Sequence, residues 1–228
     1  MGASSGGLHR IEEGLWHWER RHPEWHPGEF GAVVGSYAVR TGGVTLLIDP
    51  LVDDETDPVL SDLDDMVLGP VRILVSIPYH VRSAELLWRR YRSDDALIMG
   101  HPLAAKRFDD RTGFRSLAGG EDIEGVARTY RIGKPVRAEI PIEIPALRAL
   151  LFGDAIVEFK GRLHLWDDPI DSENRRRWYE ERFLPTMRAL ESLDVERVLV
   201  THGRPVLSGG AIALKEALDR GPWQAGSA

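Results

Sequence analysis

Short apolar runs that end on polar residues recur along this chain of 228 residues. They read LLIDP at 46–50, ILVSIPYH at 73–80, LLFGD at 150–154 and LVTHG at 199–203. Short apolar runs bounded by turn residues are typical of buried strands, and strands mixed with helical segments predict a layered α/β fold. Ligands bind beyond the carboxyl ends of strands in such folds. We therefore expect the functional site at the strand ends.

The segments between these runs predict further elements. Residues 32–41 and 43–51 are rich in β-formers and are separated by Gly42-Gly43, which predicts a hairpin. Ser83 is a predicted N-cap for a helix with a regular apolar face. Residues 173–193 read as a helix with a kink near Pro185, and residues 211–220 as the last helix.

The N-terminal part has a different character. Residues 1–14 offer little apolar surface, so we expect a flexible tail before one domain over residues 15–228. Residues 15–30 combine three Trp, three His and two Pro, which predicts a packed surface loop.

Composition excludes several classes of protein. The formal net charge is −7, which disfavours nucleic acid as a partner. The absence of cysteine rules out disulfides, thiolate metal sites and a cysteine nucleophile. No apolar run reaches the roughly 18 residues of a membrane span, and no secretory signal is evident. We expect a cytoplasmic protein without a membrane partner. The composition leaves open whether the chain forms a homo-oligomer.

The order of these elements resembles the metallo-β-lactamase superfamily over about residues 15–218. The resemblance implies an αββα four-layer sandwich with a metal site at one edge. The superfamily's HxHxDH signature falls on residues 78–83, where only His80 keeps a ligand and Arg82 stands at the aspartate position. Pro78 and Ser83 stand at the other two histidine positions, and the histidine expected before the Gly-Asp strand is absent from residues 141–149.

Later signatures of the superfamily match better. Asp154 stands at the position of its metal-bridging aspartate, and His202 at that of its last ligand. Asp49 stands at the position of a structural aspartate that is not usually a ligand. Two imidazoles and one carboxylate suit a single zinc or iron ion. The resemblance thus implies a mononuclear metal site built from His80, Asp154 and His202.

Two interpretations of this site follow. In the first, the protein is a metal-dependent hydrolase of an ester, thioester or lactone, and Arg82 or Tyr79 stabilises the developing negative charge. In the second, Arg82 pairs with Asp154, no metal is bound, and the protein is a non-catalytic ligand-binding or partner-binding member of the fold. A small molecule is the expected ligand or substrate in either case.

Aromatic and histidine side chains could form the walls of the pocket. The candidates are Trp16, Trp18, His22, Trp25 and His101, whose simpler interpretation is structural packing. Other nucleophilic schemes are disfavoured, since the chain has no GxSxG elbow, no phosphate-binding GxxxxGK[ST] loop and no GxGxxG after a strand.

Overall fold

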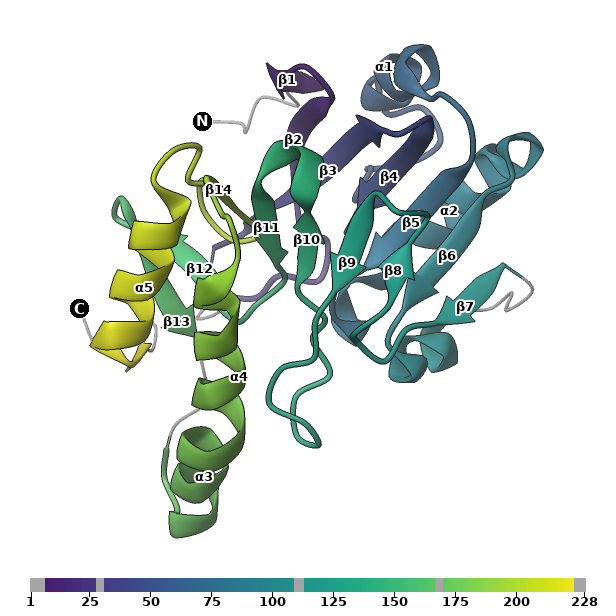
Figure 1. Ribbon diagram of the computed structural model, residues 1–228. Coiled ribbons are helices and arrows are strands. Elements are labelled where there is room, and N and C mark those ends of the chain that lie inside the picture. Colours follow the sequence, from purple (N-terminus) through teal and green to yellow (C-terminus); the bar gives the residue numbers. More distant parts are fainter. Residues whose placement is uncertain (1–6, 28–30, 109–112, 167–169, 224–228) are drawn as a thin grey trace.

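The computed structural model describes residues 7–27, 31–108, 113–166 and 170–223. Two β-sheets face each other, and helices cover the outer face of each (Figure 1). Helices α1 (Val59–Met66) and α2 (Ala84–Arg90) cover the first sheet. Helices α3 (Glu173–Trp178), α4 (Leu184–Ala189) and α5 (Gly210–Arg220) cover the second. The predicted αββα four-layer sandwich is confirmed.

The first sheet contains seven strands in their sequence order. They are β1 (His9–Glu12), β2 (Leu15–Arg21), β3 (Val33–Thr41), β4 (Val44–Ile48), β5 (Val71–Val75), β6 (Leu97–Gly100) and β7 (Phe114–Ser116). Strands β3 and β4 are antiparallel and joined by Gly42 and Gly43, whose φ angles are 57° and 78°. Two successive residues with positive φ make the tight turn that glycine favours. The predicted hairpin is therefore confirmed.

The second sheet has five strands in a mixed order. They lie in the order β14 (Arg197–Val200), β11 (Ala149–Phe152), β10 (Ile142–Ile144), β9 (Ala127–Thr129) and β8 (Asp122–Ile123). A small third sheet contains β12 (Ile156–Phe159), β13 (Arg162–Trp166) and β15 (Pro222–Trp223).

A pair of parallel strands in each sheet places the loops that follow them at one edge of the sandwich. Strands β4 and β5 are parallel, and so are β11 and β14. The residue after β4 is Asp49, and a 3-10 helical turn, η1 (Pro78–Val81), follows β5 and carries His80. Asp154 and His202 lie two residues beyond β11 and β14. Side chains distant in sequence thus follow the same ends of neighbouring strands.

Three apolar clusters hold the layers together. One lies between the two sheets, and its central members, such as Leu46, Ile142 and Leu151, are buried completely or almost so. A second joins the first sheet to α1 and α2, and a third joins the second sheet to α3, α4 and α5. Each sheet is thus covered by apolar side chains on both faces, as a four-layer sandwich requires.

The N-terminal part differs from our expectation. His9–Glu12 form β1, so the expected flexible tail is wrong for these residues, and residues 1–6 lie outside the described ones. Residues 15–21 form strand β2 instead of a loop, because their main chain pairs with β3 along its whole length. Pairing satisfies the backbone hydrogen bonds and overrides the unusual composition.

Two predicted helices differ in detail from what the sequence indicates. The helix over 173–193 is interrupted by a π-helical turn, Tyr179–Phe183, directly before α4 and its Pro185. Proline cannot donate the helical hydrogen bond, so the expected irregularity is confirmed. Ser83 flanks α2 without capping it through its side chain, because its hydroxyl exchanges hydrogen bonds with the main chain of Val52.

A buried ion pair ties β2 to the start of α1. The Arg20 guanidinium donates to both carboxylate oxygens of Asp57, and both side chains are almost fully buried. Asp57 also accepts hydrogen bonds from the main chain of Asp53 and Val59. The pair therefore fixes the loop that leads from β4 into α1.

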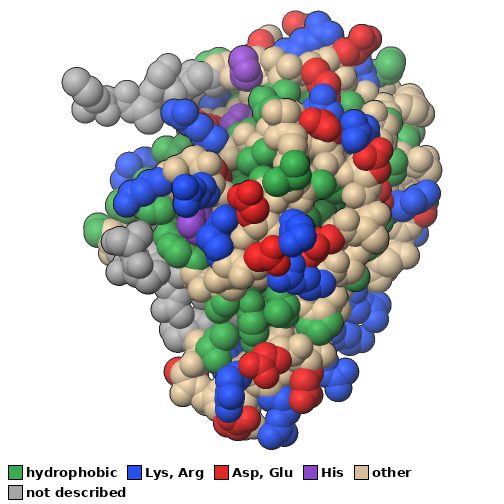
Figure 2. Space-filling model, turned by 60° about the vertical axis from the view of Figure 1, so that its left-hand side comes forward, with side chains coloured by type: hydrophobic (Ala, Val, Ile, Leu, Met, Phe, Trp, Pro, Cys, Tyr) green, Lys and Arg blue, Asp and Glu red, His purple; other side chains and the backbone are tan. Residues whose placement is uncertain are grey.

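Many other charged side chains lie at the surface. Figure 2 shows acidic and basic side chains interspersed over the visible face, without a large area of one sign. In the described part of the chain, no helix is both long enough and apolar enough to cross a lipid bilayer.

Removal of the buried Asp57 carboxylate tests the importance of this ion pair. We expect Asp57→Asn to lower the free energy of unfolding by about 3–5 kcal/mol, because it removes the carboxylate that accepts from Nε and Nη2 of the buried guanidinium. The control is Asp194→Asn, which removes an exposed carboxylate paired with Arg148 and should cost much less. Urea denaturation measures both, and equal losses would contradict the assignment.

Candidate metal centre

Three side chains predicted as ligands converge at the edge of the sandwich. The Oδ1 atom of Asp154 lies 3.2 Å from Nε2 of His80 and 3.3 Å from Nε2 of His202. These three ligand atoms all lie within 4.8 Å of one another. Within the described ranges they form the one group of three or more His, Cys, Asp or Glu side chains arranged to hold a metal ion.

The spacing fits a small divalent cation. Zinc binds imidazole nitrogen and carboxylate oxygen at about 2.0–2.2 Å, which at tetrahedral angles separates neighbouring ligand atoms by roughly 3.3–3.5 Å. The two separations from Oδ1 of Asp154 lie close to this value. This oxygen is buried, and its neighbours are the two ring nitrogens, which are both metal-binding atoms. The residues present therefore fit a metal ion.

A second carboxylate orients the first imidazole. Nδ1 of His80 lies 2.9 Å from Oδ2 of Asp49, which is fully buried. Asp49 itself is held by Ser76, whose main-chain N–H and hydroxyl both donate to it. When Nδ1 of His80 donates to Asp49, Nε2 faces Asp154. This is the common support of a metal-binding histidine, and Asp49 lies behind a ligand position without being one.

Electrostatics set the protonation of His80. Burial lowers its pKa and the charge of Arg82 lowers it further, but the carboxylates of Asp154 and Asp49 outweigh both and raise the pKa to about 9. In the absence of metal, His80 is therefore an imidazolium between two carboxylates at neutral pH. A metal ion bound by His80 would take the place of the proton on Nε2.

Asp154 and His202 have the protonation states that metal binding needs. Burial by itself would raise the pKa of Asp154, but the charge of His80 and its contacts with both imidazoles hold that pKa well below its usual range. Burial lowers the pKa of His202 more than the Asp154 carboxylate raises it. Near neutral pH the site contains an ionised carboxylate and a neutral imidazole beside the protonated His80.

A buried glutamate that we did not predict positions Asp154. The carboxylate of Glu139 accepts main-chain hydrogen bonds from Gly153 and Ala155, the two neighbours of Asp154, at 3.0 Å and 2.8 Å. Burial raises the pKa of Glu139, although the partner cation Arg137 opposes this shift. Its sequence context, an alternating apolar segment, carries no signal for this role.

Gly153 permits the close approach of the two sheets at the site. A Cβ atom on this residue would lie 2.5 Å from the hydroxyl oxygen of Ser76, which is too close for any side chain. The main-chain oxygen of Gly153 also accepts a hydrogen bond from the hydroxyl of Thr201, the residue before His202. The Gly-Asp turn is thus packed against both neighbouring ligand loops.

Arg82 lies beside the site but does not pair with Asp154. Its Nη1 donates to the main-chain oxygens of Gly35 and Asp49 at 3.0 Å and 2.8 Å. Its Nε and Nη2 atoms are buried and make no hydrogen bond to a described residue. Among those residues, no ion pair joins Arg82 to Asp154, so the pairing expected for a metal-free centre is not formed in this structure.

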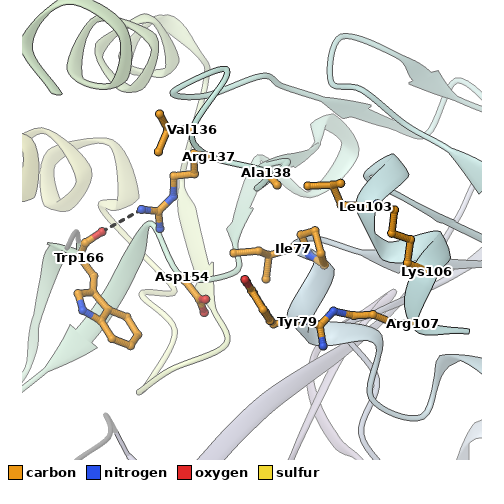
Figure 3. Close-up of a pocket in the computed structure, with 11 residues that line it drawn as sticks. Ile77, Tyr79, Leu103, Lys106, Arg107, Val136, Arg137, Ala138, Asp154 and Trp166 are labelled. Atoms are coloured by element: carbon orange, nitrogen blue, oxygen red, sulfur yellow. Dashed lines mark hydrogen bonds between the residues drawn. The ribbon is translucent and has the colours of Figure 1, made fainter. Parts of the chain in front are cut away.

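A cleft opens beside Asp154 (Figure 3). Its volume is about 610 Å³, and its walls include Ile77, Tyr79 and Trp166. Tyr79 is 65% exposed, and the guanidinium of Arg107 stacks on its ring at 4.4 Å. The edge of Trp166 also contacts His202. Tyr79 therefore lies where the sequence analysis placed it, next to the ligand group.

Most predicted wall residues lie elsewhere. Trp18 is buried in the outer apolar cluster and donates to Leu51, and Trp16 packs against that cluster. The ring of Trp25 is covered by Arg21, and His101 accepts a hydrogen bond from the main chain of the helical turn it caps. These four side chains are not among the described residues that line the cleft. For Trp16 and Trp18 the reason is the pairing of β2 with β3, which directs both side chains into the core.

His22 is the exception among the predicted wall residues. Burial lowers its pKa, and the nearby charges of Arg82, His80 and His202 lower it further. The ring of His22 therefore lies close enough to the ligand group for the charges there to affect its pKa, although it does not line the cleft described above.

Comparison with known proteins shows the fold. No protein-family model and no curated protein sequence matches the chain. Solved structures do match, among them VMB-1, with a TM-score of 0.64 and 15% identity over 96% of this chain and 97% of that one. A metallo-β-lactamase from Erythrobacter litoralis gives 0.61 and 16% over 96% and 97%. A fragment of a putative diflavin flavoprotein from Nostoc sp. PCC 7120 gives 0.64 and 18% over 93% of each chain. The resemblance in the sequence is confirmed at the level of fold.

The charge on His80 predicts a pH dependence of stability in the metal-free protein. Its folded pKa of about 9 lies above the ordinary value of 6.5, so its stabilisation is complete below pH 6.5 and is lost as the pH rises through about 9. Between these values we expect the free energy of unfolding to fall by up to about 1.4 kcal/mol per pH unit. Urea denaturation in the presence of a chelator measures this slope.

Two variants control this measurement. His80→Gln should abolish the slope between pH 6.5 and 9, whereas His164→Gln should retain it, because the pKa of His164 is lowered by burial. An NMR titration that places the His80 ring below pH 6.5 in the metal-free protein would contradict the assignment.

Proposed function

Because the chain has the metallo-β-lactamase fold and its ligand atoms converge at the edge of the sandwich, we propose that it is a metal-dependent hydrolase. His80, Asp154 and His202 hold one divalent ion, zinc or iron, and the substrate is an ester, a thioester or a lactone. One observation carries the proposal: the buried Oδ1 of Asp154 lies 3.2 Å and 3.3 Å from two imidazole nitrogens.

The donor set suits hydrolytic chemistry. A bound zinc ion would act as a Lewis acid and lower the pKa of water to about 7, which provides a nucleophile at neutral pH. The three side chains leave room for such a water, because catalytic zinc commonly has three protein ligands and one open position. Asp49 supports this arrangement by holding the ring of His80 from behind.

Arg82 accounts for a single ion in place of two. Its guanidinium is permanently charged and anchored through Nη1 to two main-chain oxygens, at the sequence position where the superfamily has a ligand aspartate. Its remaining buried donors, Nε and Nη2, have no hydrogen-bond partner among the described residues. Donors fixed in this way can stabilise the negative charge that develops on the substrate oxygen during attack. We assign Arg82 this catalytic role.

The cleft holds the substrate beside the ligand group. The apolar side chains of Ile77, Pro78 and Trp166 exclude water from the wall next to Asp154. The Tyr79 ring is held by the Arg107 guanidinium and leans over the same region (Figure 3). Its hydroxyl can donate to the acyl oxygen, so Tyr79 is the second group that we propose to contact the substrate. The proposed partner is therefore a small molecule, taken up from the cytoplasm.

The non-catalytic alternative has less support. It requires Arg82 to neutralise Asp154, whereas the Arg82 guanidinium donates to main-chain oxygens and Asp154 lies between two imidazoles. A chain that bound no metal and hydrolysed none of the three substrate classes would favour it again.

Metal analysis of the purified chain tests the proposal directly. After chelation and titration with Zn²⁺ or Fe²⁺, we expect about one equivalent bound and hydrolysis of at least one of the three substrate classes. Asp154→Ala and His202→Ala should each bind less than about a tenth of an equivalent and lose at least about a hundredfold in kcat/KM. His164→Ala, which changes a histidine on β13, is the control and should retain both. Less than a tenth of an equivalent in the unchanged chain would refute the metal site.

Replacement of Arg82 separates catalysis from metal binding. We expect Arg82→Gln to retain the metal and to lower kcat by about a hundredfold to a thousandfold, the usual effect of removing a donor to a developing oxyanion. Arg82→Lys keeps a charge but lacks the planar donors, so it should restore only part of the rate. An unchanged kcat in Arg82→Gln would contradict the catalytic role.

A further inference from the structure

The cleft beside Asp154 has an uneven charge. It is lined by the cations Lys106, Arg107 and Arg137, and Asp154 is the one carboxylate in its lining among the described residues. Arg137 is neutralised by the buried carboxylate of Glu139, at 3.0 Å. Lys106 and Arg107, in contrast, have no carboxylate within ion-pair distance in the described part of the chain. Counting the described residues alone, the cleft therefore keeps two positive charges without a carboxylate partner.

The positive charge of this cleft contrasts with the charge of the whole chain, which has a formal net charge of −7. Some exposed cations elsewhere are paired, as Arg90 is with Asp64 and Lys215 with Asp219. Two neighbouring cations that have no acidic partner among the described residues, at the wall of a concave site, form a local positive field that attracts an anion.

The two cations come from one rigid element. They lie on the 3-10 helical turn η3 (Pro102–Arg107), whose first turn is fixed by the cap at His101. Arg107 is further restrained by its contact with the Tyr79 ring at 4.4 Å. A guanidinium held on an aromatic face has lost much of its conformational freedom before any ligand arrives. Anion binding at this position therefore costs little additional ordering.

Apolar side chains separate these cations from the ligand group. In Figure 3 the side chains of Ile77 and Tyr79 lie between Asp154 on one side and Lys106 and Arg107 on the other. Leu103, Val136 and Ala138 complete the walls. A molecule that spans the cleft would therefore place a reactive bond near Asp154, an apolar portion against Ile77, and an anionic group beside Lys106.

We propose that Lys106 and Arg107 are specificity-determining residues that bind an anionic group of the substrate, separated from the scissile acyl bond by a short apolar segment. The substrate class is accordingly an ester, thioester or lactone that carries a carboxylate or phosphate at the far end of its acyl chain. This inference rests on the proposed hydrolase function, but anion binding by the cleft can be measured without it.

A binding experiment on the metal-free full-length chain isolates the anion site. The probes are 6-phenylhexanoate and its neutral amide, 6-phenylhexanamide, measured by isothermal titration calorimetry. We expect the carboxylate to bind at least about tenfold more tightly, and added salt to reduce this preference. Equal affinities for the two probes would overturn the proposal.

Three variants locate the preference. The double variant Lys106→Gln/Arg107→Gln should abolish the preference for the carboxylate, and so should Lys106→Glu, because each leaves no net positive charge at the two positions. Lys215→Gln removes one positive charge on α5, away from the cleft, and should leave it unchanged. A preference that persists in the double variant, or that falls equally in Lys215→Gln, would also overturn the assignment.

A kinetic experiment on the metal-loaded chain extends the test to specificity. The substrates are mono(4-nitrophenyl) adipate, which carries a free carboxylate, and neutral 4-nitrophenyl hexanoate. We expect kcat/KM to favour the adipate by about tenfold or more, and the double variant to lose this ratio mainly through KM. Equal kcat/KM values would overturn the specificity role.

The two experiments separate the failure of each proposal. Carboxylate preference without hydrolysis of any ester would refute the hydrolase function and leave the anion site in place. Hydrolysis without carboxylate preference in either experiment would refute the anion site and leave the hydrolase function in place.

Discussion

The contact of one carboxylate oxygen with two imidazole nitrogens organises this structure. Oδ1 of Asp154 can face both His80 and His202 only because parallel strands in two different sheets end at the same edge. Two of the three side chains are then supported from behind: His80 by Asp49, and the turn around Asp154 by Glu139. The apolar interior fixes the strands, the strands fix the turns, and the turns fix three atoms to the separations that a small cation requires.

Much of the site could be predicted, since the signals were local. An apolar run that ends in Gly-Asp or Thr-His-Gly shows that a polar side chain follows a buried strand, and the superfamily resemblance joined Asp154 and His202 into one site. Such local patterns do not reveal hydrogen-bond partners that are distant in the sequence. Glu139 lies in an alternating segment typical of a half-buried strand, so neither its complete burial nor its bonds to the turn at Asp154 could be inferred.

The failures at the N-terminus have a different cause. Tryptophan, histidine and proline within 15–30 suggested an irregular loop, but main-chain pairing with β3 makes residues 15–21 a strand. Once in the sheet, alternate side chains must point inward, and Trp18 enters the core instead of the pocket. The contacts of Arg82 were likewise not predictable from the sequence. Its charge predicted an ion pair with Asp154, whereas its guanidinium satisfies the carbonyls of Gly35 and Asp49, which no sequence pattern reveals.

The tight packing of Gly153 against Ser76 has a consequence for ion selection. Gly153 carries Asp154 directly, while Ser76 holds the aspartate that supports His80, so the two sheets are locked together beside the ligand atoms. Close packing at this point would oppose a widening of the gap between Asp154 and His80. In the metal site proposed above, a cation such as calcium, which needs bonds of about 2.3–2.6 Å to many oxygens, would therefore fit less well than a smaller ion. The size of the ion would thus contribute to its selection in addition to the chemistry of the donor atoms.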